Sequence, residues 1–263
     1  MTNKSPLLEI DARGIATVTL DRPEKHNAFN EIIIAELTSI FDEVENSKEA
    51  KIMVLQSTGK NFSAGADLDW MKRMAGYNYD ENIRDANALA RMLHKLNFLS
   101  IPTIARVQGA AMGGGAGLVC CCDIAIVTSN ASFAFSETKL GLLPATIAPY
   151  VLQSIGSQAA RRYFLSAERF NAERALALGM VSEVVDASEL DEKIIHLIET
   201  ILANSAEAVK AAKQLITDID GKPVTEELMQ LTSERIGEIR ASEEGIEGLA
   251  AFLEKRNPAW VNE

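Results

Sequence analysis

The sequence predicts an α/β fold with a helical region at its C-terminal end. Two observations predict it: strand-like and helix-like segments alternate through the first half, and helical patterns dominate from Ala159 onward. The composition is that of a globular chain, since 47% of the 263 residues are hydrophobic and 24% are charged. At this length we expect one large core, residues 1–200, and a smaller helical region, residues 201–263.

The elements of the first half follow from hydrophobic periodicity. LLEID and IATVTLD, separated by a turn at residues 12–14, predict a β-hairpin. Apolar residues at helical spacing predict a helix from Asn30 to Glu45, with Asn30 as its cap. Further along, IMVLQS, TIARVQ and DIAIVTS predict strands, and the segment from Ala86 to Leu99 predicts a helix.

The second half contains one clear strand-like run, MVSEVV, among helical patterns. Four helices are expected in succession, at residues 189–203, 206–218, 225–240 and 243–255. Several of them carry an apolar stripe opposite a charged face. Such a region is typical of a lid over an active site or of an assembly surface.

Charge and cysteine usage exclude several classes of partner. The chain has 26 Lys and Arg against 37 Asp and Glu, a formal charge of −11, which argues against nucleic acid or an anionic membrane. Cys120, Cys121 and Cys122 are adjacent, so they form neither a disulfide framework nor a spaced metal site. The N-terminal segment lacks the apolar run of a signal peptide, and no apolar run reaches the roughly 20 residues that span a bilayer. We therefore expect a cytoplasmic protein without a metal.

Two glycine-containing loops are the candidates for chemistry, because the sequence has no GxSxG, HExxH or P-loop motif. One is Phe62–Leu68, and the other is Gln108–Leu118, which contains three consecutive glycines. Glycines at the start of a helix let a ligand approach unpaired backbone N–H groups. One N–H from each loop could hold a carbonyl oxygen that gains negative charge during a reaction. Close packing of helix against sheet explains the same glycines equally well.

Several segments resemble, in order and spacing, the crotonase superfamily, also called the enoyl-CoA hydratase/isomerase family. They are DRPEKHNAFN, FSAGADL, VQGAAMGGGAGL with CCDIAI, FSETKLGLLP, SAERFNAERALALGMVSEVV and EGLAAFLEKRNPAW, and they cover residues 8–260. The resemblance implies a spiral of ββα units that trimerises through its C-terminal helices, often as a dimer of trimers. It also implies an acyl-CoA thioester as substrate, with no cofactor besides the coenzyme A that the substrate carries.

The resemblance also implies roles for individual residues. The backbone N–H groups of Ala66 and Gly114 correspond to the oxyanion hole of the family, and Glu137 corresponds to a catalytic glutamate. The segments at residues 68–74, 79–89 and 142–147 would line the acyl pocket. Contacts to coenzyme A and the substrate would fall on Lys25, His26, Ala28, Ala64, Asp67, Leu68, Gly113 and Lys255.

One position departs from the family pattern. Typical hydratases carry a first catalytic glutamate where this chain has Gly117, so Glu137 is left as the one central carboxylate. The segments nonetheless look most like hydratases of branched, carboxylated substrates of the methylglutaconyl-CoA and carboxygeranoyl-CoA type. Such a substrate would bring its own acid–base group, and Gly117→Glu would restore a second one if the pocket has room.

Two alternatives stay open. A Δ3,Δ2-enoyl-CoA isomerase needs only one glutamate, which is returned as an acid after it acts as a base. A non-catalytic or RNA-binding relative would also show the loss of a glutamate. The acidic charge argues against RNA as the partner.

Overall fold

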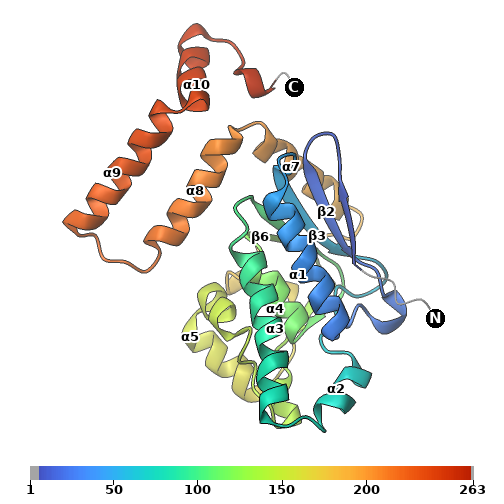
Figure 1. Ribbon diagram of the computed structural model, residues 1–263. Coiled ribbons are helices and arrows are strands. Elements are labelled where there is room, and N and C mark those ends of the chain that lie inside the picture. The colour runs from blue at the N-terminus through green and yellow to red at the C-terminus, as the bar shows by residue number, and fades with distance from the viewer. Residues whose placement is uncertain (1–5, 262–263) are drawn as a thin grey trace. The chain divides into compact units, whose positions relative to one another are not determined.

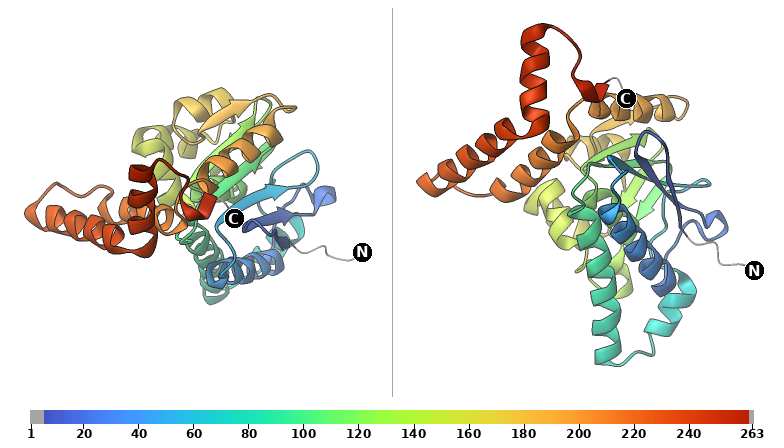
Figure 2. Two further views of the ribbon diagram at one scale, coloured as in Figure 1. Left: turned by 90° about the horizontal axis from the view of Figure 1, so that it is seen from above. Right: turned by 45° about the horizontal axis from the view of Figure 1, so that its top comes forward.

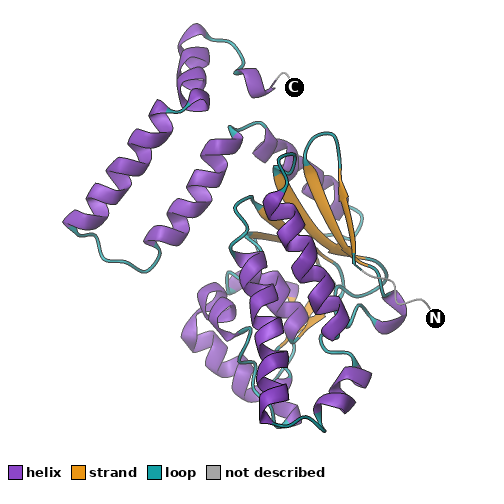
Figure 3. Cartoon of the chain, viewed as in Figure 1, coloured by secondary structure: helices purple, strands orange, loops and turns teal. Residues whose placement is uncertain are grey.

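The computed structural model describes residues 6–261, and the chain divides into two compact units. The first unit takes the chain up to Leu99 together with Thr103–Ile194. The second takes Ser100–Pro102 and the residues from Ile195 onward. Figure 1 follows both units along the chain, and Figure 3 shows that all the strands lie in the first of them.

A six-stranded sheet organises the first unit. Its order is β1 (Leu7–Ile10), β2 (Ile15–Leu20), β3 (Ile52–Ser57), β4 (Thr103–Val107), β6 (Ile124–Thr128) and β9 (Glu183–Val185). β1 and β2 form the predicted hairpin, and every later neighbour pairs in parallel. The central strand β3 is almost entirely buried, as its apolar run predicts.

A second, three-stranded sheet was not predicted, because its strands are too short to show a period. It consists of β5 (Ala110–Met112), β7 (Ser132–Ala134) and β8 (Phe170–Asn171). β4, β5 and α4 (Gly114–Cys121) follow one another, as do β6, β7 and α5 (Ala148–Ser166), so each turn of the chain gives one strand to each sheet and then a helix. This repetition confirms the expected crotonase-like arrangement of ββα units.

The helices of the first unit bury their apolar faces. α1 (Glu31–Asn46) begins at the expected cap, because the side chain of Asn30 accepts hydrogen bonds from the N–H groups of Ile32 and Ile33. α3 (Tyr79–Asn97) packs beside α1, as Figures 1 and 2 both show. The other helices of this part are η1 (Pro23–Lys25), α2 (Leu68–Met74), η2 (Glu137–Leu140) and α6 (Ala172–Ala177).

The predicted start of α3 at Ala86 was wrong. The helix begins seven positions earlier, at Tyr79, because Asn78 and Glu81 form a reciprocal capping box. The spacing Asn-x-x-Glu is visible in the sequence, but the charged first turns that follow it conceal the helical period. The early turns of α3 carry Asp85, which accepts a hydrogen bond from the indole of Trp70 in α2 at 3.2 Å.

The second unit is helical, as predicted. α7 (Leu190–Leu202) leads into it, and α8 (Ala206–Ile219), α9 (Glu226–Ala241), α10 (Glu243–Glu254) and η3 (Ala259–Val261) follow. Neither α8 nor α9 has a buried residue, and α10 buries Ala251 alone. Large apolar side chains stay exposed here, including Met229, Ile236, Ile246, Leu249, Phe252 and Leu253.

The three cysteines are part of α4 and of its C-terminal cap. Cys120 and Cys121 are buried, and Cys122 is half-buried. Burial raises the pKa of the Cys120 thiol to about 12 and raises that of Cys121 well above its ordinary value. They therefore pack as small apolar residues, as the sequence predicts. In the described part of the chain, no helix is both long enough and apolar enough to cross a bilayer.

Candidate active site

The two glycine loops singled out in the sequence lie side by side. Ser63 and Ala111 form a parallel bridge, in which Ser63 donates its N–H to Ala110 and Met112 donates its N–H to the Ser63 carbonyl. A Cβ built on Gly65 would lie 3.8 Å from the backbone nitrogen of Gly114. The loops of residues 62–68 and 108–118 therefore meet at their glycines.

The N–H of Ala66 belongs to the first loop and is held by a bridge to Phe29. Phe29 donates its N–H to Gly65 at 2.9 Å, and its carbonyl accepts the N–H of Asp67 at 3.0 Å. In a parallel bridge of this kind, the N–H and C=O groups of Ala66, which lies between Gly65 and Asp67, point away from Phe29. The Ala66 N–H is therefore turned away from the strand that holds it.

The N–H of Gly114 belongs to the second loop and opens α4. As the first residue of the helix, it contributes one of the N–H groups that have no acceptor within the helix. Gly113 precedes it with φ +50°, a conformation that L side chains rarely adopt, and donates its own N–H to Ala134 at 2.8 Å. The helix start is thereby fixed against the second sheet, and the first N–H groups of α4 lack acceptors within the helix.

Glu137 lies beside this helix start. It follows β7, which pairs in parallel with β5, so Glu137 and the glycine loop occupy the carboxyl ends of neighbouring strands. A Cβ built on Gly113 would lie 3.0 Å from Oε1 of Glu137. Oε2 of the same carboxyl group is buried and has no hydrogen-bond partner. Burial raises the pKa of Glu137, against a smaller lowering by a hydrogen bond from its own backbone.

Gly117 lies one helical turn beyond Gly113 and is covered by an apolar side chain. A Cβ at Gly117 would lie 2.3 Å from Cγ2 of Ile147 and 3.9 Å from Cδ2 of Leu93. Ile147 is buried at the start of α5. The space that a side chain at position 117 would need is therefore filled by Ile147, so the room that Gly117→Glu requires is missing unless Ile147 is also made smaller.

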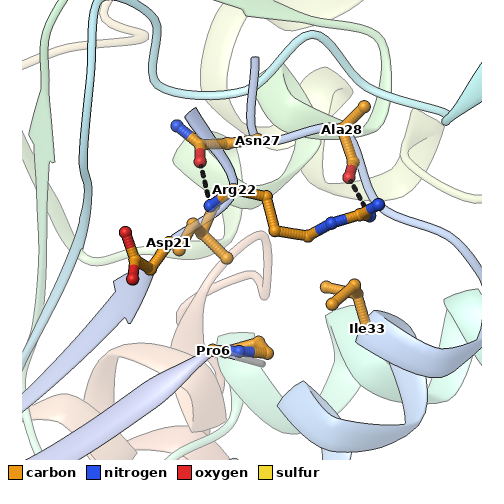
Figure 4. Close-up of a pocket in the computed structure, with 7 residues that line it drawn as sticks. Pro6, Asp21, Arg22, Asn27, Ala28 and Ile33 are labelled. Carbon is orange, nitrogen blue, oxygen red and sulfur yellow. Dashed lines mark hydrogen bonds between the residues drawn. The ribbon is translucent and has the colours of Figure 1, made fainter. Parts of the chain in front are cut away.

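The loop of residues 22–28 is held by buried polar side chains, and Figure 4 shows those of Arg22 and Asn27. The buried guanidinium of Arg22 donates to the Ala28 carbonyl at 2.9 Å and pairs with Asp67 at 3.4 Å. Asn27, with φ +54°, accepts the N–H of Arg22 and donates to the carbonyls of Thr58 and Asn61. The cavity that Figure 4 shows beside Arg22 is only about 10 Å³, about the room of one water, so it is not a substrate pocket.

The positions expected to contact coenzyme A divide between the two units. Lys25 already pairs with Asp69 at 3.2 Å and lies 4.0 Å from Asp67, while His26 contacts Asn61 through Nδ1 at 3.2 Å. Ala64 and Leu68 are exposed. Lys255 ends α10 in the second unit. Among residues 6–261, no group of three or more His, Cys, Asp and Glu side chains could hold a metal ion.

Sequence reasoning missed the roles of Arg22 and Phe29. Arg22 stands in the quoted segment DRPEKHNAFN, but nothing in the segment shows that its partner is Asp67, 45 positions away. Phe29 reads as an ordinary core residue and is indeed buried. The burial of Arg22 and the left-handed conformations of His26 and Asn27 appear only in the structure, so the sequence carried no signal for these roles.

Together these groups can polarise a carbonyl and move a proton beside it. Two backbone N–H groups, from Ala66 and from a helix N-terminus, are suited to an oxygen that becomes negative. A buried carboxylate with an unpartnered oxygen is suited to accept a proton from a neighbouring atom. Two reactions need such donors together with such a carboxylate. One is the addition of water to a double bond next to a thioester, and the other is the migration of that double bond along the acyl chain.

Comparison with known proteins agrees with this geometry. Residues 11–263 match the enoyl-CoA hydratase/isomerase family. The chain belongs to that family.

Relatives in the family cover the whole fold. The structure of an enoyl-CoA hydratase from Shewanella pealeana is 45% identical, with a TM-score of 0.92, over 96% of this chain and 94% of that one. A Legionella pneumophila structure of the enoyl-CoA hydratase/isomerase (crotonase) type is 43% identical, with a TM-score of 0.93, over 98% and 100%. The short-chain-enoyl-CoA hydratase of Clostridium acetobutylicum is 34% identical over 92% of each chain. The family assignment confirms the expected class of enzyme.

Proposed function

We propose that this chain adds water across the 2,3 double bond of an enoyl-CoA thioester. The observation that carries the proposal is the carboxyl group of Glu137, which lies beside the start of α4 with one buried, unpartnered oxygen. The names of the relatives support hydration as the reaction. The buried carboxylate supplies the acid–base group that hydration needs.

In the proposed reaction, the N–H groups of Ala66 and Gly114 donate to the thioester oxygen. The carboxylate of Glu137 takes a proton from water as the water oxygen bonds to C3 of the acyl chain. The electron pair of the double bond moves to C2 and is held as an enolate by the two donors. Glu137 then returns its proton to C2, so the net change is addition of one water.

We further propose that the preferred acyl chain is branched or carries a carboxylate, as in 3-methylglutaconyl-CoA. The support is the apolar surface at position 117, where Ile147 leaves no room for a second carboxyl group from the protein. A carboxylate on the substrate would act as a second acid–base group and share the two proton transfers with Glu137. No metal or redox cofactor takes part in this scheme.

Isomerisation of a 3-enoyl to a 2-enoyl chain is the second candidate. The presence of Glu137 without a second carboxylate at position 117 also favours isomerisation, because one carboxylate suffices to remove a proton from C2 and deliver it to C4. The apolar side chain of Ile147 would also exclude water from the opposite side of the reacting carbons. The two candidates therefore differ in whether water reaches C3.

Turnover of a substrate panel tests the proposal. Crotonyl-, 3-methylcrotonyl-, 3-methylglutaconyl- and 3-enoyl-CoA are each followed by enoyl absorbance. Loss of absorbance that is fastest for 3-methylglutaconyl-CoA supports the proposal, whereas equal kcat/KM for 3-methylglutaconyl- and 3-methylcrotonyl-CoA contradicts the role of the substrate carboxylate. A gain of absorbance from 3-enoyl-CoA without hydration identifies the isomerase.

The second unit is proposed to serve assembly and coenzyme binding. The exposed apolar side chains of α9 and α10 suit a homotrimer or a dimer of trimers. Phe252 is the extreme case, with 81% of its surface exposed in the single chain. Lys25 and Lys255 are proposed to pair with the phosphates of coenzyme A, Lys25 in competition with Asp69. Sedimentation of the wild type against Phe252→Asp tests the assembly surface.

A further inference from the structure

One buried side chain touches both loops that carry the proposed donors. Phe29 holds the first loop through its backbone, by the hydrogen bonds to Gly65 and from Asp67 that flank Ala66. It meets the second loop through its ring, because a Cβ built on Gly114 would lie 2.5 Å from Cζ and 3.0 Å from Cε2 of Phe29. The phenyl group therefore fills the space where any side chain at Gly114 would stand.

We propose that Phe29 is a positioning residue that sets the separation of the two backbone donors, Ala66 N–H and Gly114 N–H. The inference rests on the proposed function, since it takes these two groups as the donors to the thioester oxygen. Its backbone is bonded to the first loop and its rigid ring packs against Gly114, so a shift of one loop is transmitted to the other. Phe29 is 1% exposed, so its ring cannot shift without displacing the residues packed around it.

Two substitutions move this spacing in opposite directions. Phe29→Leu keeps the backbone hydrogen bonds and removes the ring atoms that meet Gly114, so the loops can approach or tilt. Phe29→Tyr adds an oxygen to Cζ, the ring atom nearest to Gly114, and pushes the loops apart. Both variants should lose kcat by about 10- to 100-fold, because small misplacement of catalytic groups is costly. The Kd for butyryl-CoA, a saturated ground-state analogue, should change little.

A double variant at positions 29 and 114 distinguishes a positioning role of Phe29 from a role in packing alone. Gly114→Ala places a Cβ against the Phe29 ring, but the residue lies in helical conformation, so alanine itself is allowed there. Combined with Phe29→Leu, the new methyl group occupies space that the ring has vacated and leaves the N–H in place. The double variant should therefore recover kcat relative to either single variant.

The readout is the polarisation of a bound thioester. 4-Dimethylaminocinnamoyl-CoA absorbs at longer wavelength when its carbonyl oxygen accepts strong hydrogen bonds. The wild type should shift this absorbance, Phe29→Leu and Phe29→Tyr should shift it less, and the double variant should restore the shift. Phe41→Leu, a like change at a fully buried phenylalanine in α1, should lower Tm and leave both kcat and the shift unchanged.

Several outcomes overturn the inference. They are unchanged kcat and shift in both Phe29 variants, a double variant no better than the single ones, or an equal loss in Phe41→Leu. If Phe29→Leu does not fold, Phe29→Tyr alone decides, by losing or keeping the shift. A wild type that neither shifts the probe nor turns over the substrate panel overturns the proposed function itself, and this inference with it.

Discussion

Two successive turns of α4 meet opposite kinds of side chain. Gly113, at the N-terminal end, faces the carboxyl group of Glu137, and Gly117, one turn later, faces the methyl groups of Ile147. Both positions need glycine, but for different reasons. At Gly113 the backbone is left-handed and a Cβ would crowd a reactive group, whereas at Gly117 a Cβ would collide with the core. One helix thus has a polar turn beside the carboxyl group of Glu137 and an apolar turn packed against Ile147.

Removing the carboxylate from the polar turn should have the largest effect. Glu137→Gln keeps the volume of the side chain and abolishes its basicity. We expect kcat to fall by about 10²- to 10⁴-fold, the usual contribution of a general acid–base group, with the Kd for butyryl-CoA nearly unchanged. Steady-state kinetics on the best substrate of the panel measures it. Full activity would remove Glu137 from the mechanism.

Obstructing the donor at the polar turn should cost slightly less. A Cβ at Gly114 would already lie 2.5 Å from Phe29, and Gly114→Val adds two further methyl groups. We expect a loss of about 10²- to 10³-fold in kcat, the usual effect of losing one oxyanion donor. Gly76→Ala is a control, because a Cβ there would meet only the Arg73 carbonyl at 3.5 Å. Normal turnover by Gly114→Val would mean that the glycine run serves packing alone.

The apolar turn can be tested by giving it a carboxylate. Gly117→Glu alone should destabilise the protein by about 1–3 kcal/mol, because its Cβ would lie 2.3 Å from Ile147. Adding Ile147→Ala should relieve the overlap, so that the double variant is more stable than the sum of the two single changes predicts. Urea denaturation of the four proteins measures this coupling. Strict additivity would show that Ile147 does not limit position 117.

The double variant Gly117→Glu with Ile147→Ala also tests which substrates the enzyme prefers. If the missing carboxylate is what restricts the substrate, Gly117→Glu with Ile147→Ala should gain activity on crotonyl-CoA relative to 3-methylglutaconyl-CoA. The ratio of the two kcat/KM values, compared with that of the wild type, reports the change. An unchanged ratio would place substrate preference elsewhere in the pocket.

A pH series should show the smallest effect. Burial raises the pKa of Glu137, so kcat/KM should fall on acidification at a pH above the ordinary range of a glutamate. The folded protein also binds more protons than the unfolded chain between the two pKa values, so stability should decrease as pH rises through that window. Glu137→Gln removes this penalty, and its Tm should be at least that of the wild type at neutral pH.

Glu168, whose pKa is lowered instead of raised, is a control for the pH series. Hydrogen bonds from Arg162 lower the pKa of Glu168, which contributes stability above its unfolded pKa that is lost on acidification. Glu168→Gln should therefore lower Tm at neutral pH, with the difference disappearing in acid. Because Glu168 is exposed, the effect should be small. Tm shifts of the same sign in both variants would contradict the assigned directions.

The sequence left two interpretations of its glycines open, and each holds at different positions. Gly115 and Gly117 serve close packing, since a Cβ on Gly115 would lie 2.8 Å from Ser63 and one on Gly117 would meet Ile147. Gly113 lies beside Glu137 at the candidate site, whereas Gly114 both opens α4 at that site and packs against the ring of Phe29. Local spacing cannot distinguish these roles, because the partners come from 50 residues upstream or 30 downstream along the chain.

Long periodic elements could be predicted, and short or non-local features could not. The β1–β2 hairpin, α1 with its Asn30 cap and α8 to α10 appear where apolar periods predict them. The second sheet escaped because β5 and β7 have three residues each. The same limit applies to Phe29, whose role depends on a loop that pairs with it and on a helix that its ring supports.

The cysteines of α4 have a consequence for the integrity of the enzyme. An acyl-CoA is a thioester, and a cysteine thiolate that attacks its carbonyl carbon displaces the thiolate of coenzyme A and leaves the acyl group on the protein. Cys120 follows Gly114 by less than two helical turns, yet its buried thiol has a pKa of about 12 and stays protonated at neutral pH. The helix that carries a proposed thioester donor at its start thus keeps the thiols of Cys120 and Cys121 protonated. The chain should remain free of covalent acylation after prolonged incubation with substrate, as intact-protein mass spectrometry would show.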